Sequence, residues 1–232
     1  SGEWDKYYIQ TSDIDASSTS AWDEGQGFTP MGNNSTKFTG SYDGAWYTIN
    51  GLTINRPSTN YTGLFGYTNG FTIKDLGVIN VNITGADRTG GLAGWIESNT
   101  TINNCYTTGN ITGTRLLGGL VGMVDDSSTV NNCYSTSDVN GSGNVVGGLA
   151  GKNISSSVSN CYSTGSVTGT NFVGGIIGSS TGGYAVSGLF WNIDDFSTDN
   201  GIGTGITTME MMDAYTFCFA GWDFEEDENG ND

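Results

Sequence analysis

A phrase of about 28 residues recurs along the chain and constrains its fold more than any other feature. Cys105, Cys133 and Cys161 lie 28 residues apart, each inside a similar phrase: INNCYTTGNITGT, VNNCYSTSDVNGS and VSNCYSTGSVTGT. Each phrase leads to a glycine-rich one, GGLVG, GGLAG or GGIIG, and two earlier copies read TGLFG and GGLAG. A unit this short cannot bury its own apolar side, so the copies are expected to stack.

The repeated unit consists mainly of residue types that favour strands and turns. Stretches of Val, Ile, Thr and Tyr alternate with Gly, Asn and Ser, which favours short strands over helices. Apolar pairs three residues apart recur as Ile49/Leu52, Ile73/Leu76, Ile102/Cys105, Val130/Cys133, Val158/Cys161 and Val186/Leu189. Stacked as parallel strands about 4.8 Å apart, these pairs would form inward ladders. We therefore predict an all-β chain, a right-handed parallel β-helix with about 28 residues per turn.

Both ends of this solenoid are expected to carry caps, because an open end would expose the core. The capping-box phrase from Thr207 to Glu210 predicts about two turns of helix, followed by a strand over TFCFAGWDF. Trp22, Phe28 and Trp46 are expected to close the N-terminal end. The predicted organisation is an N-terminal cap with the first turns over 1–60, repeats over 61–192, and over 193–232 a C-terminal cap with short helix, strand and acidic tail.

Charge and composition exclude several classes of function. The chain has 7 basic and 24 acidic residues and no histidine, so Ser–His and Cys–His nucleophile pairs and histidine zinc sites are impossible. Its net charge of −17 argues against binding nucleic acid. No apolar run is long enough for a transmembrane segment. The chain starts at Ser1 without an apolar leader, so we expect a processed or trimmed product from which any export signal is missing.

No cofactor is expected. The segment DVNGSGN, from Asp138 to Asn144, resembles the start of a calcium-binding loop. Such a loop needs an acidic ligand at its twelfth position, where this chain has Leu149. No specific motif therefore supports a calcium site.

The repeats resemble the GLUG family, named for its Gly-Leu-any-Gly phrase. That phrase appears here as GLFG, GLAG, GLVG, GLAG and GIIG. The flanks, YYIQTSDIDAS at the start and GTGITTMEMMDAYTFCFAGWDF at the end, are also similar to those of surface proteins with such repeats. The resemblance implies a right-handed β-helix like those of filamentous-haemagglutinin-type adhesins, an extracellular location at the cell surface, and no catalytic residues carried over.

The repeated cysteine is interpreted as a core residue. Leu52, Leu76 and Leu189 hold the same slot in other copies, and a slot that accepts leucine is apolar and inward. A line of stacked thiols also lacks the tetrahedral arrangement of a zinc site, although a disulfide between neighbouring copies stays open. Cys218 lies outside the repeat and is either a thiol for an inter-subunit bridge or a buried cap residue.

The glycine-rich strand is apolar on both alternating faces, which predicts burial on both faces. One face would be the core, and the other would need a cover. The cover would be either the C-terminal segment with Tyr215, Phe217, Phe219, Trp222 and Phe224, or a neighbouring subunit. The residues expected on this second face, and hence our interface candidates, are Leu117, Val121, Val146, Ala150, Val173 and Ile177, with Phe65 as a further member.

An aromatic residue follows each cysteine: Tyr106, Tyr134 and Tyr162, and then Phe190. Neighbouring residues on a strand point to opposite faces, so this ladder should face outward. It is either a strip that binds sugars or a partner, or a self-stacking column that stabilises the coil, and we favour the second. A Thr84/Thr112/Asn140/Thr168 array is too irregular to favour ice binding.

Asn-X-Ser/Thr sequons are numerous and would be surface glycan sites in an exported protein. A chain rich in Asn, Ser and Thr also generates them by accident. The candidate acceptors are Asn34, Asn60, Asn82, Asn99, Asn110, Asn140 and Asn153, with Asn33 beside the first.

These features favour a non-enzymatic structural or adhesive surface protein that self-associates through its flanks or ends into a sheath, surface layer or fibre. The alternative is a carbohydrate-binding module that uses the tyrosine ladder. A glycan-degrading β-helix enzyme is the weaker alternative, because it needs carboxylates clustered over a groove. The adjacent pairs Asp125/Asp126 and Asp194/Asp195 are more typical of solvated turns.

Overall fold

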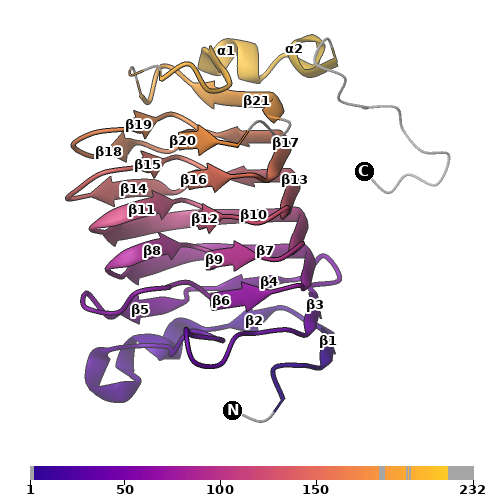
Figure 1. The fold of residues 1–232 in the computed structure, drawn as a ribbon, viewed down its shortest axis with the longest axis vertical. Coiled ribbons are helices and arrows are strands. Elements are labelled where there is room, and N and C mark those ends of the chain that lie inside the picture. The colour runs from indigo at the N-terminus through magenta and orange to yellow at the C-terminus, as the bar shows by residue number, and fades with distance from the viewer. Residues whose placement is uncertain (1–2, 183–185, 197, 199, 219–232) are drawn as a thin grey trace, which may run out of the picture.

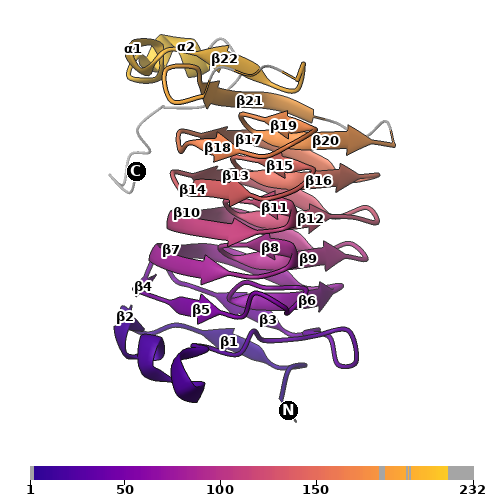
Figure 2. The same ribbon diagram turned by 90° about the vertical axis from the view of Figure 1, so that its left-hand side faces the viewer.

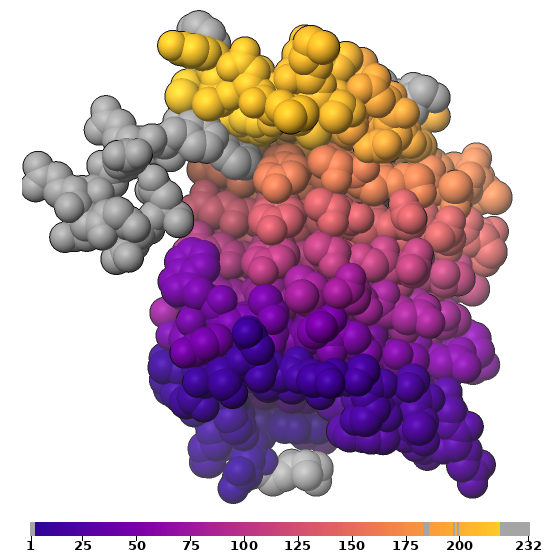
Figure 3. Space-filling model, turned by 180° about the vertical axis from the view of Figure 1, so that it is seen from behind, coloured from indigo at the N-terminus to yellow at the C-terminus, as the bar shows by residue number. Residues whose placement is uncertain are grey.

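The chain folds as a parallel β-solenoid, and the predicted fold class is confirmed. The computed structural model describes residues 3–182, 186–196, 198 and 200–218. They form about 5 turns of about 28 residues each, stacked along one axis from the N-terminal to the C-terminal end (Figure 1). In the space-filling view the colours follow one another in level bands, so each turn contacts mainly the turns before and after it (Figure 3).

Three parallel sheets form the walls of the solenoid (Figure 2). The first, which we call the long sheet, contains β1 (Tyr7–Ile9), β2 (Ile14–Asp15), β3 (Ser41–Asp43), β4 (Thr48–Asn50), β5 (Thr53–Asn55), β7 (Thr72–Thr84), β10 (Thr101–Gly113), β13 (Thr129–Ser135), β14 (Asp138–Gly141), β17 (Ser157–Ser163), β18 (Val167–Thr168), β21 (Val186–Asn192) and β22 (Thr204–Ile206). The four-stranded sheet contains β8 (Asp87–Gly90), β11 (Arg115–Gly118), β15 (Val146–Gly147) and β19 (Val173–Gly174). The five-stranded sheet contains β6 (Phe65–Asn69), β9 (Ala93–Glu97), β12 (Val121–Val124), β16 (Ala150–Ile154) and β20 (Ile177–Thr181).

Successive copies of the repeat pair with one another in register. Ile102 pairs with Ile73 on one side and with Val130 on the other, and Val158 continues the same column. All four side chains are at most 1% exposed. The N-terminal copy departs from the prediction: Tyr42 pairs with Ile73, whereas Ile49 pairs with Val78. The reason is an extra turn at residues 45–46, between β3 and β4, which shifts the sequence relative to the later copies.

The three-residue spacing of the inward pairs has a backbone cause. Asn104, Asn132 and Asn160 adopt left-handed backbone angles, with φ of +53°, +52° and +50°. Asn tolerates this conformation better than most residues. The resulting irregularity interrupts the two-residue alternation of the strand, so that Ile102 and Cys105 both point into the core. The Asn directly before the Cys of each NNC or SNC phrase is therefore a conformational signal.

The last glycine of each GLxG phrase lies where two sheets touch. A Cβ on Gly122 would lie 2.6 Å from the carbonyl oxygen of Gly94 and 2.6 Å from the amide nitrogen of Thr89 in the four-stranded sheet. Gly94 meets the backbone of Arg88 in the same way, and Gly151 meets that of Leu116. Only a residue without a side chain fits at such a contact. We call this line of close contacts the glycine seam.

The C-terminal end carries two short helices, α1 (Thr208–Met211) and α2 (Ala214–Cys218). The predicted capping box is present: Thr207 accepts from the amide of Glu210, and Glu210 accepts from the amide of Thr207. The predicted strand over 216–224 is wrong where it is described, because Thr216 to Cys218 belong to α2. Asp213 accepts from the amide of Tyr215 at the start of that helix. The rest of the predicted strand lies outside the described residues.

The N-terminal end is covered by β1, β2 and two 3-10 turns, η1 (Ser17–Ala21) and η2 (Asp23–Gly25). Of the three aromatic residues expected to close it, Phe28 packs against the core. Trp22 and Trp46 are 50% and 72% exposed, so they do not act as a plug. No helix in the described part of the chain is long and apolar enough to cross a membrane.

We expect the substitution Gly122→Ala to destabilise the fold by at least about 2 kcal/mol, because its Cβ would press on backbone atoms that cannot rotate away. Urea unfolding measures the loss. Gly25→Ala is the control: its φ is +85° but no atom lies within 4 Å of an added Cβ, so only the backbone penalty of about 1 kcal/mol applies. An equal or smaller loss for Gly122→Ala would contradict the close contact at the seam.

Candidate functional site

The tyrosine ladder is a stack of rings on the outer side of the long sheet. The ring centroids of Tyr106 and Tyr134 are 4.8 Å apart with an interplanar angle of 7°, and those of Tyr134 and Tyr162 are 4.8 Å apart at 5°. Burial raises the pKa of Tyr162, and burial with the neighbouring phenols raises the pKa of Tyr134 to about 12. The phenols of Tyr134 and Tyr162 are therefore neutral at ordinary pH.

Stacking covers the ring faces with which a sugar would pack. Each face of Tyr134 lies against a neighbouring ring. The ring of Tyr106 lies over Gly77, where a Cβ would come 2.4 Å from its Cζ atom. Only ring edges and hydroxyl groups remain for contact along the ladder. The geometry thus favours the stabilising role of this column over a sugar-binding strip.

The interface candidates on the glycine-rich strand lie inside the chain. Leu117, Val121, Val146 and Ile177 are 0% exposed and Ala150 is 2% exposed, all within the core cluster, and Phe65 is also fully buried. Val173 is half-buried and packs against the same cluster. The expectation that this set needs a separate cover is therefore wrong.

The physical reason is again a left-handed residue. Leu116, Val145 and Phe172 have φ of +55°, +66° and +52°, which shifts the alternation by one position. Of these three residues, Phe172 is exposed and Val145 is half-buried, and Leu116, although buried, lies outside the core cluster that contains Leu117 and Val146. Phe172 is 65% exposed, and it lies beside the last turn.

A second aromatic group, which the sequence analysis missed, lies on the five-stranded sheet. The rings of Tyr67 and Trp95 stack with centroids 4.3 Å apart, and Tyr61 stacks on both. The guanidinium of Arg88 lies 4.8 Å from the ring centroid of Trp95, and Lys37 lies 4.4 Å from that of Tyr67. The available signal was the 28-residue spacing from Tyr67 to Trp95. Because Tyr67 is only 3% exposed, these rings also cover one another.

The repeated cysteines form a column in the core. Cys105, Cys133 and Cys161 are at most 1% exposed and form no disulfide, and the column continues to Leu76 and Leu189. Leu52, which was assigned to the same slot, is buried in a different column because of the shift in the N-terminal copy. Burial raises the pKa of the Cys105 and Cys161 thiols, so these thiols stay protonated. Cys218 is exposed at the end of α2.

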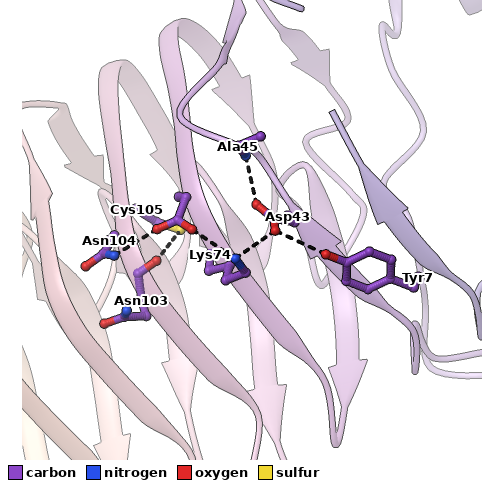
Figure 4. A network of polar contacts seen from close by, with 8 residues as sticks. Tyr7, Asp43, Ala45, Lys74, Asn103, Asn104 and Cys105 are labelled. Atoms are coloured by element: carbon purple, nitrogen blue, oxygen red, sulfur yellow. Dashed lines mark hydrogen bonds and ion pairs between the residues drawn. The ribbon is translucent and has the colours of Figure 1, made fainter. Parts of the chain in front are cut away.

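A chain of polar contacts runs across successive strands of the long sheet (Figure 4). Asp43 accepts from the hydroxyl of Tyr7 at 3.1 Å and pairs with the ammonium of Lys74 at 2.7 Å. Lys74 also pairs with Asp75 at 3.1 Å, and Asp75 accepts from the amide of Asn104 at 2.8 Å. Side-chain bonds continue from Asn104 to Asn132 and Asn160.

The charges of this network stabilise one another. The hydrogen bond from Lys74 holds the pKa of Asp43 below its usual range, and Asp43 and Asp75 together raise the pKa of Lys74. The network ties the N-terminal strand to successive turns, so its role is to hold the stack together.

The sequons divide by burial. Asn34, Asn60, Asn82, Asn99, Asn110 and Asn140 are exposed, as is Asn33, so a glycan could be attached to each. Asn153 is 1% exposed and is wrong as a glycan acceptor in the folded chain. Its amide donates to the carbonyl of Ser156 at 3.0 Å and to the hydroxyl of Ser180 at 3.1 Å.

Both acidic pairs lie in turns that follow strands. Asp125 and Asp126 lie in the turn after β12. Asp194 accepts from the amide of Thr208 at the start of α1, and Asp195 accepts from Asn192. Asp138, in the segment that resembles a calcium loop, accepts from Ser166 instead. Within the described residues, no three His, Cys, Asp or Glu side chains converge as a metal site would require.

The structure is a β-solenoid in which the repeated GLxG phrase places a glycine at the glycine seam. Residues 142–168 match the family model of the GLUG motif, so the chain carries that motif, as its sequence predicts. The five GLxG phrases occupy equivalent places in successive turns.

Two relatives share part of this sequence. A stretch of 108 residues, 44% of this chain, is 40% identical to halomucin from Haloquadratum walsbyi and covers 1% of that protein. A stretch of 62 residues, 26% of this chain, is 40% identical to a protein named "Putative Gly-rich membrane protein" from Evansella cellulosilytica and covers 7% of it. The chain thus spans a small fraction of the length of these relatives.

A solved structure has a similar fold. It is the crystal structure of a "putative immunoglobulin A1 protease" from Bacteroides ovatus, with a TM-score of 0.64 and 23% sequence identity. The match covers 80% of this chain and 59% of that one. At this level of identity the likeness shows the fold alone.

We expect the stability of the wild-type chain to fall above about pH 10, where an exposed tyrosine ionises. Because the folded pKa of Tyr134 is raised to about 12, the unfolded chain loses this proton before the folded chain does. The stability that it contributes is therefore complete below pH 10 and is lost between about 10 and 12.

The test compares urea unfolding of the wild type and Tyr134→Phe at pH 8 and pH 11. Phe keeps the stack but cannot ionise, so the variant should lose less stability between the two pH values. Equal losses of stability in the two proteins would show that Tyr134 has the same pKa in the folded and the unfolded chain, which would contradict the prediction.

We expect the sequon at Asn153 to stay unmodified when the chain is produced in a host that glycosylates exported proteins, while exposed sequons such as Asn82 and Asn110 become occupied. Asn153→Ala should cost about 1–3 kcal/mol, because the buried carbonyl of Ser156 and the half-buried hydroxyl of Ser180 lose their donor. Glycopeptide mass spectrometry and urea unfolding measure the two effects. The control Asn82→Ala, at an exposed site, should leave the stability nearly unchanged.

Proposed function

We propose that the chain is a non-enzymatic, extracellular structural module of a cell-surface protein, and that it self-associates through its ends. The observation that carries the proposal is the distribution of exposed apolar side chains along a stack of in-register turns. In the part of the chain that the structure describes, the large apolar side chains that are exposed lie outside residues 48–171, although that range holds most of the regular repeats. The walls of the coil are therefore polar and the ends are not.

The N-terminal end exposes several apolar side chains. Tyr7, Ile9 and Ile14 on the terminal strands are 64%, 56% and 42% exposed. Beside them Trp22 borders an apolar cavity of about 260 Å³ that reaches the core residue Leu52. Strand β1 is the last strand of the long sheet at this end, and a terminal strand can pair with another chain.

The C-terminal end is also apolar. Met209, Met212 and Tyr215 are 83%, 84% and 73% exposed. Repetition of an end-to-end contact would lengthen the coil into a fibre or a component of a sheath. Self-association through the flanks is less well supported. The interface candidates of the glycine-rich strand, on which it mainly depended, are core residues.

Location and the absence of an enzymatic activity complete the proposal. The names of the two relatives, "Halomucin" and "Putative Gly-rich membrane protein", support a place at the cell surface. The carboxylates that a glycan-cleaving enzyme would need are engaged in turns and helix caps. We expect no hydrolysis of polysaccharides by the purified chain.

We expect the wild-type chain to associate as its concentration rises, and more strongly in high salt. The reason is that salt screens the repulsion between copies that each carry a charge of −17. The double variant Ile9→Lys/Ile14→Lys should remain a monomer. Sedimentation velocity over a hundredfold range of concentration measures both.

A matched control places two lysines on the polar flank, as Asn82→Lys/Asn110→Lys, and should associate as the wild type does. A wild type that stays monomeric at every concentration and salt level would refute self-association. Loss of association in the flank control, with the end variant unaffected, would move the contact to the flank.

A further inference from the structure

Three side chains of complementary chemistry meet on the five-stranded sheet, near the N-terminal end of the coil. The ammonium of Lys37 donates a hydrogen bond to Glu97 Oε1, and the side-chain amide of Asn69 donates to the same oxygen at 3.0 Å. The cluster thus combines an amine, a carboxamide and a carboxylate. These groups are a nucleophile, an acyl donor and an acid–base catalyst for the transfer of an amide bond.

Pairing between strands brings the three residues together. Asn69, the last residue of β6, pairs in register with Glu97, the last residue of β9. Phe38 forms a parallel bridge to Thr68, and its carbonyl accepts from the backbone amide of Asn69 at 2.9 Å, so Lys37 lies beside the end of β6. Backbone hydrogen bonds therefore fix the positions of all three residues, and such positioning favours a reaction between their side chains.

The side-chain amide of Asn69 is held in one orientation. Its nitrogen donates to Glu97 and also to the hydroxyl of Ser98, at 2.9 Å. Ser98 in turn donates to Asp126 at 3.2 Å. Both hydrogens of Nδ2 therefore have a partner. The nitrogen that must leave when an amide is transferred already lies within the reach of about 2.6–3.2 Å that proton transfer from a side chain requires.

The surroundings of the cluster favour proton transfer from the amine to the carboxylate. The side chains of Lys37 and Glu97 are 32% and 15% exposed, and the buried ring of Tyr67 has its centroid 4.4 Å from Lys37 Nζ. Burial raises the pKa of Glu97, but the hydrogen bonds that it accepts, from Lys37 first, outweigh burial and hold this pKa below its usual range. Glu97 is therefore a carboxylate at rest and can act as a base. Transfer of the proton neutralises both groups, which burial favours.

We propose that Lys37 and Asn69 form an intramolecular amide bond, an isopeptide, and that Glu97 transfers the protons. Glu97 takes a proton from the Lys37 ammonium, and the neutral Nζ attacks Cγ of Asn69. The Nζ–Cγ bond forms, and the Cγ–Nδ2 bond breaks once Glu97 has protonated Nδ2. The second proton released by Nζ passes through Glu97 to the departing ammonia, which leaves as ammonium. Charge and atoms balance, and no oxidant is needed.

A cluster of similar composition in the long sheet offers an internal comparison (Figure 4). Asp75 pairs with Lys74 at 3.1 Å and accepts from Asn104 at 2.8 Å, but through different oxygens. In the described part of the chain, Lys74 also pairs with Asp43 at 2.7 Å, whereas Lys37 pairs with a single carboxylate. Asp43 and Asp75 raise the pKa of Lys74, so it stays an ammonium and is no nucleophile. We expect no bond between Lys74 and Asn104.

The isopeptide would fasten the N-terminal end of the coil to its first regular turn. It would join the segment before β3 to the end of β6 and close the chain between them into a loop, which stabilises a fold by restricting the unfolded chain. This covalent bond adds to the structural role proposed above and does not depend on self-association.

Mass spectrometry of the folded, purified chain tests the proposal. The wild type should be lighter than its sequence by one ammonia, and its digest should contain a branched peptide that joins Lys37 to Asn69. Lys37→Arg keeps the positive charge but cannot form the bond, and Glu97→Gln keeps the shape but cannot move the protons. Both variants should retain the full mass. The matched control Lys74→Arg should be linked as the wild type is.

Urea unfolding gives an independent readout. The wild type and Lys74→Arg should unfold at a higher urea concentration than Lys37→Arg, because they carry the cross-link. Circular dichroism verifies that each variant is folded. The mass of the folded wild type is decisive by itself, so a variant that fails to fold does not protect the proposal.

The proposal is overturned if the folded wild type has the full mass of its sequence and yields no branched peptide, or if Glu97→Gln is linked as completely as the wild type. A loss of ammonia that persists in Lys37→Arg also overturns it. Asn69 precedes Gly70, and its side chain would then have closed a succinimide ring with the backbone instead. Sedimentation velocity is a separate measurement, so failure here leaves the proposed structural role standing.

Discussion

Register between successive turns is the constraint on which the rest of this structure depends. In the regular turns, a strand residue pairs in register with its own counterpart about 28 positions away. Cys133 pairs with Cys161 in this way, and Tyr134 pairs with Tyr162. A side chain that suits one turn must then suit its copies above and below. Two devices keep the register: a left-handed Asn that turns two apolar residues inward, and a glycine that lets two sheets touch.

The same stacking explains why the walls of the coil offer little free surface for recognition. Aromatic rings that recur at the repeat spacing cover one another, and polar side chains bond along the axis in the network that joins Tyr7 to Asn160. These interactions are satisfied within the chain and contribute to its stability. The stack of turns stops at the two ends of the coil, where apolar side chains are exposed. Function is therefore expected there.

The repeat alone was enough to predict the parallel solenoid, the inward columns and the cysteines in the core, because identical spacing in sequence becomes identical position in space. The capping box of α1 was also readable, since it depends on residues three apart. What failed were assignments that assume strict alternation along a strand. Leu117 was placed outside and is inside, because Leu116 has a positive φ that no residue-type preference would suggest. Asn153 looked like a glycan acceptor, yet it fills an inward position that other turns give to Val124 or Ile96. The cluster of Lys37, Asn69 and Glu97 joins three separate segments of the chain, and no local pattern encodes such a meeting.

Small-angle X-ray scattering of the wild-type chain over a range of concentrations in high salt tests the central claim most directly, because it separates growth in length from growth in width. The account predicts that the maximum dimension increases with concentration while the radius of gyration of the cross-section stays that of a single coil. An increase in the cross-section, which means coils lying side by side, would contradict it.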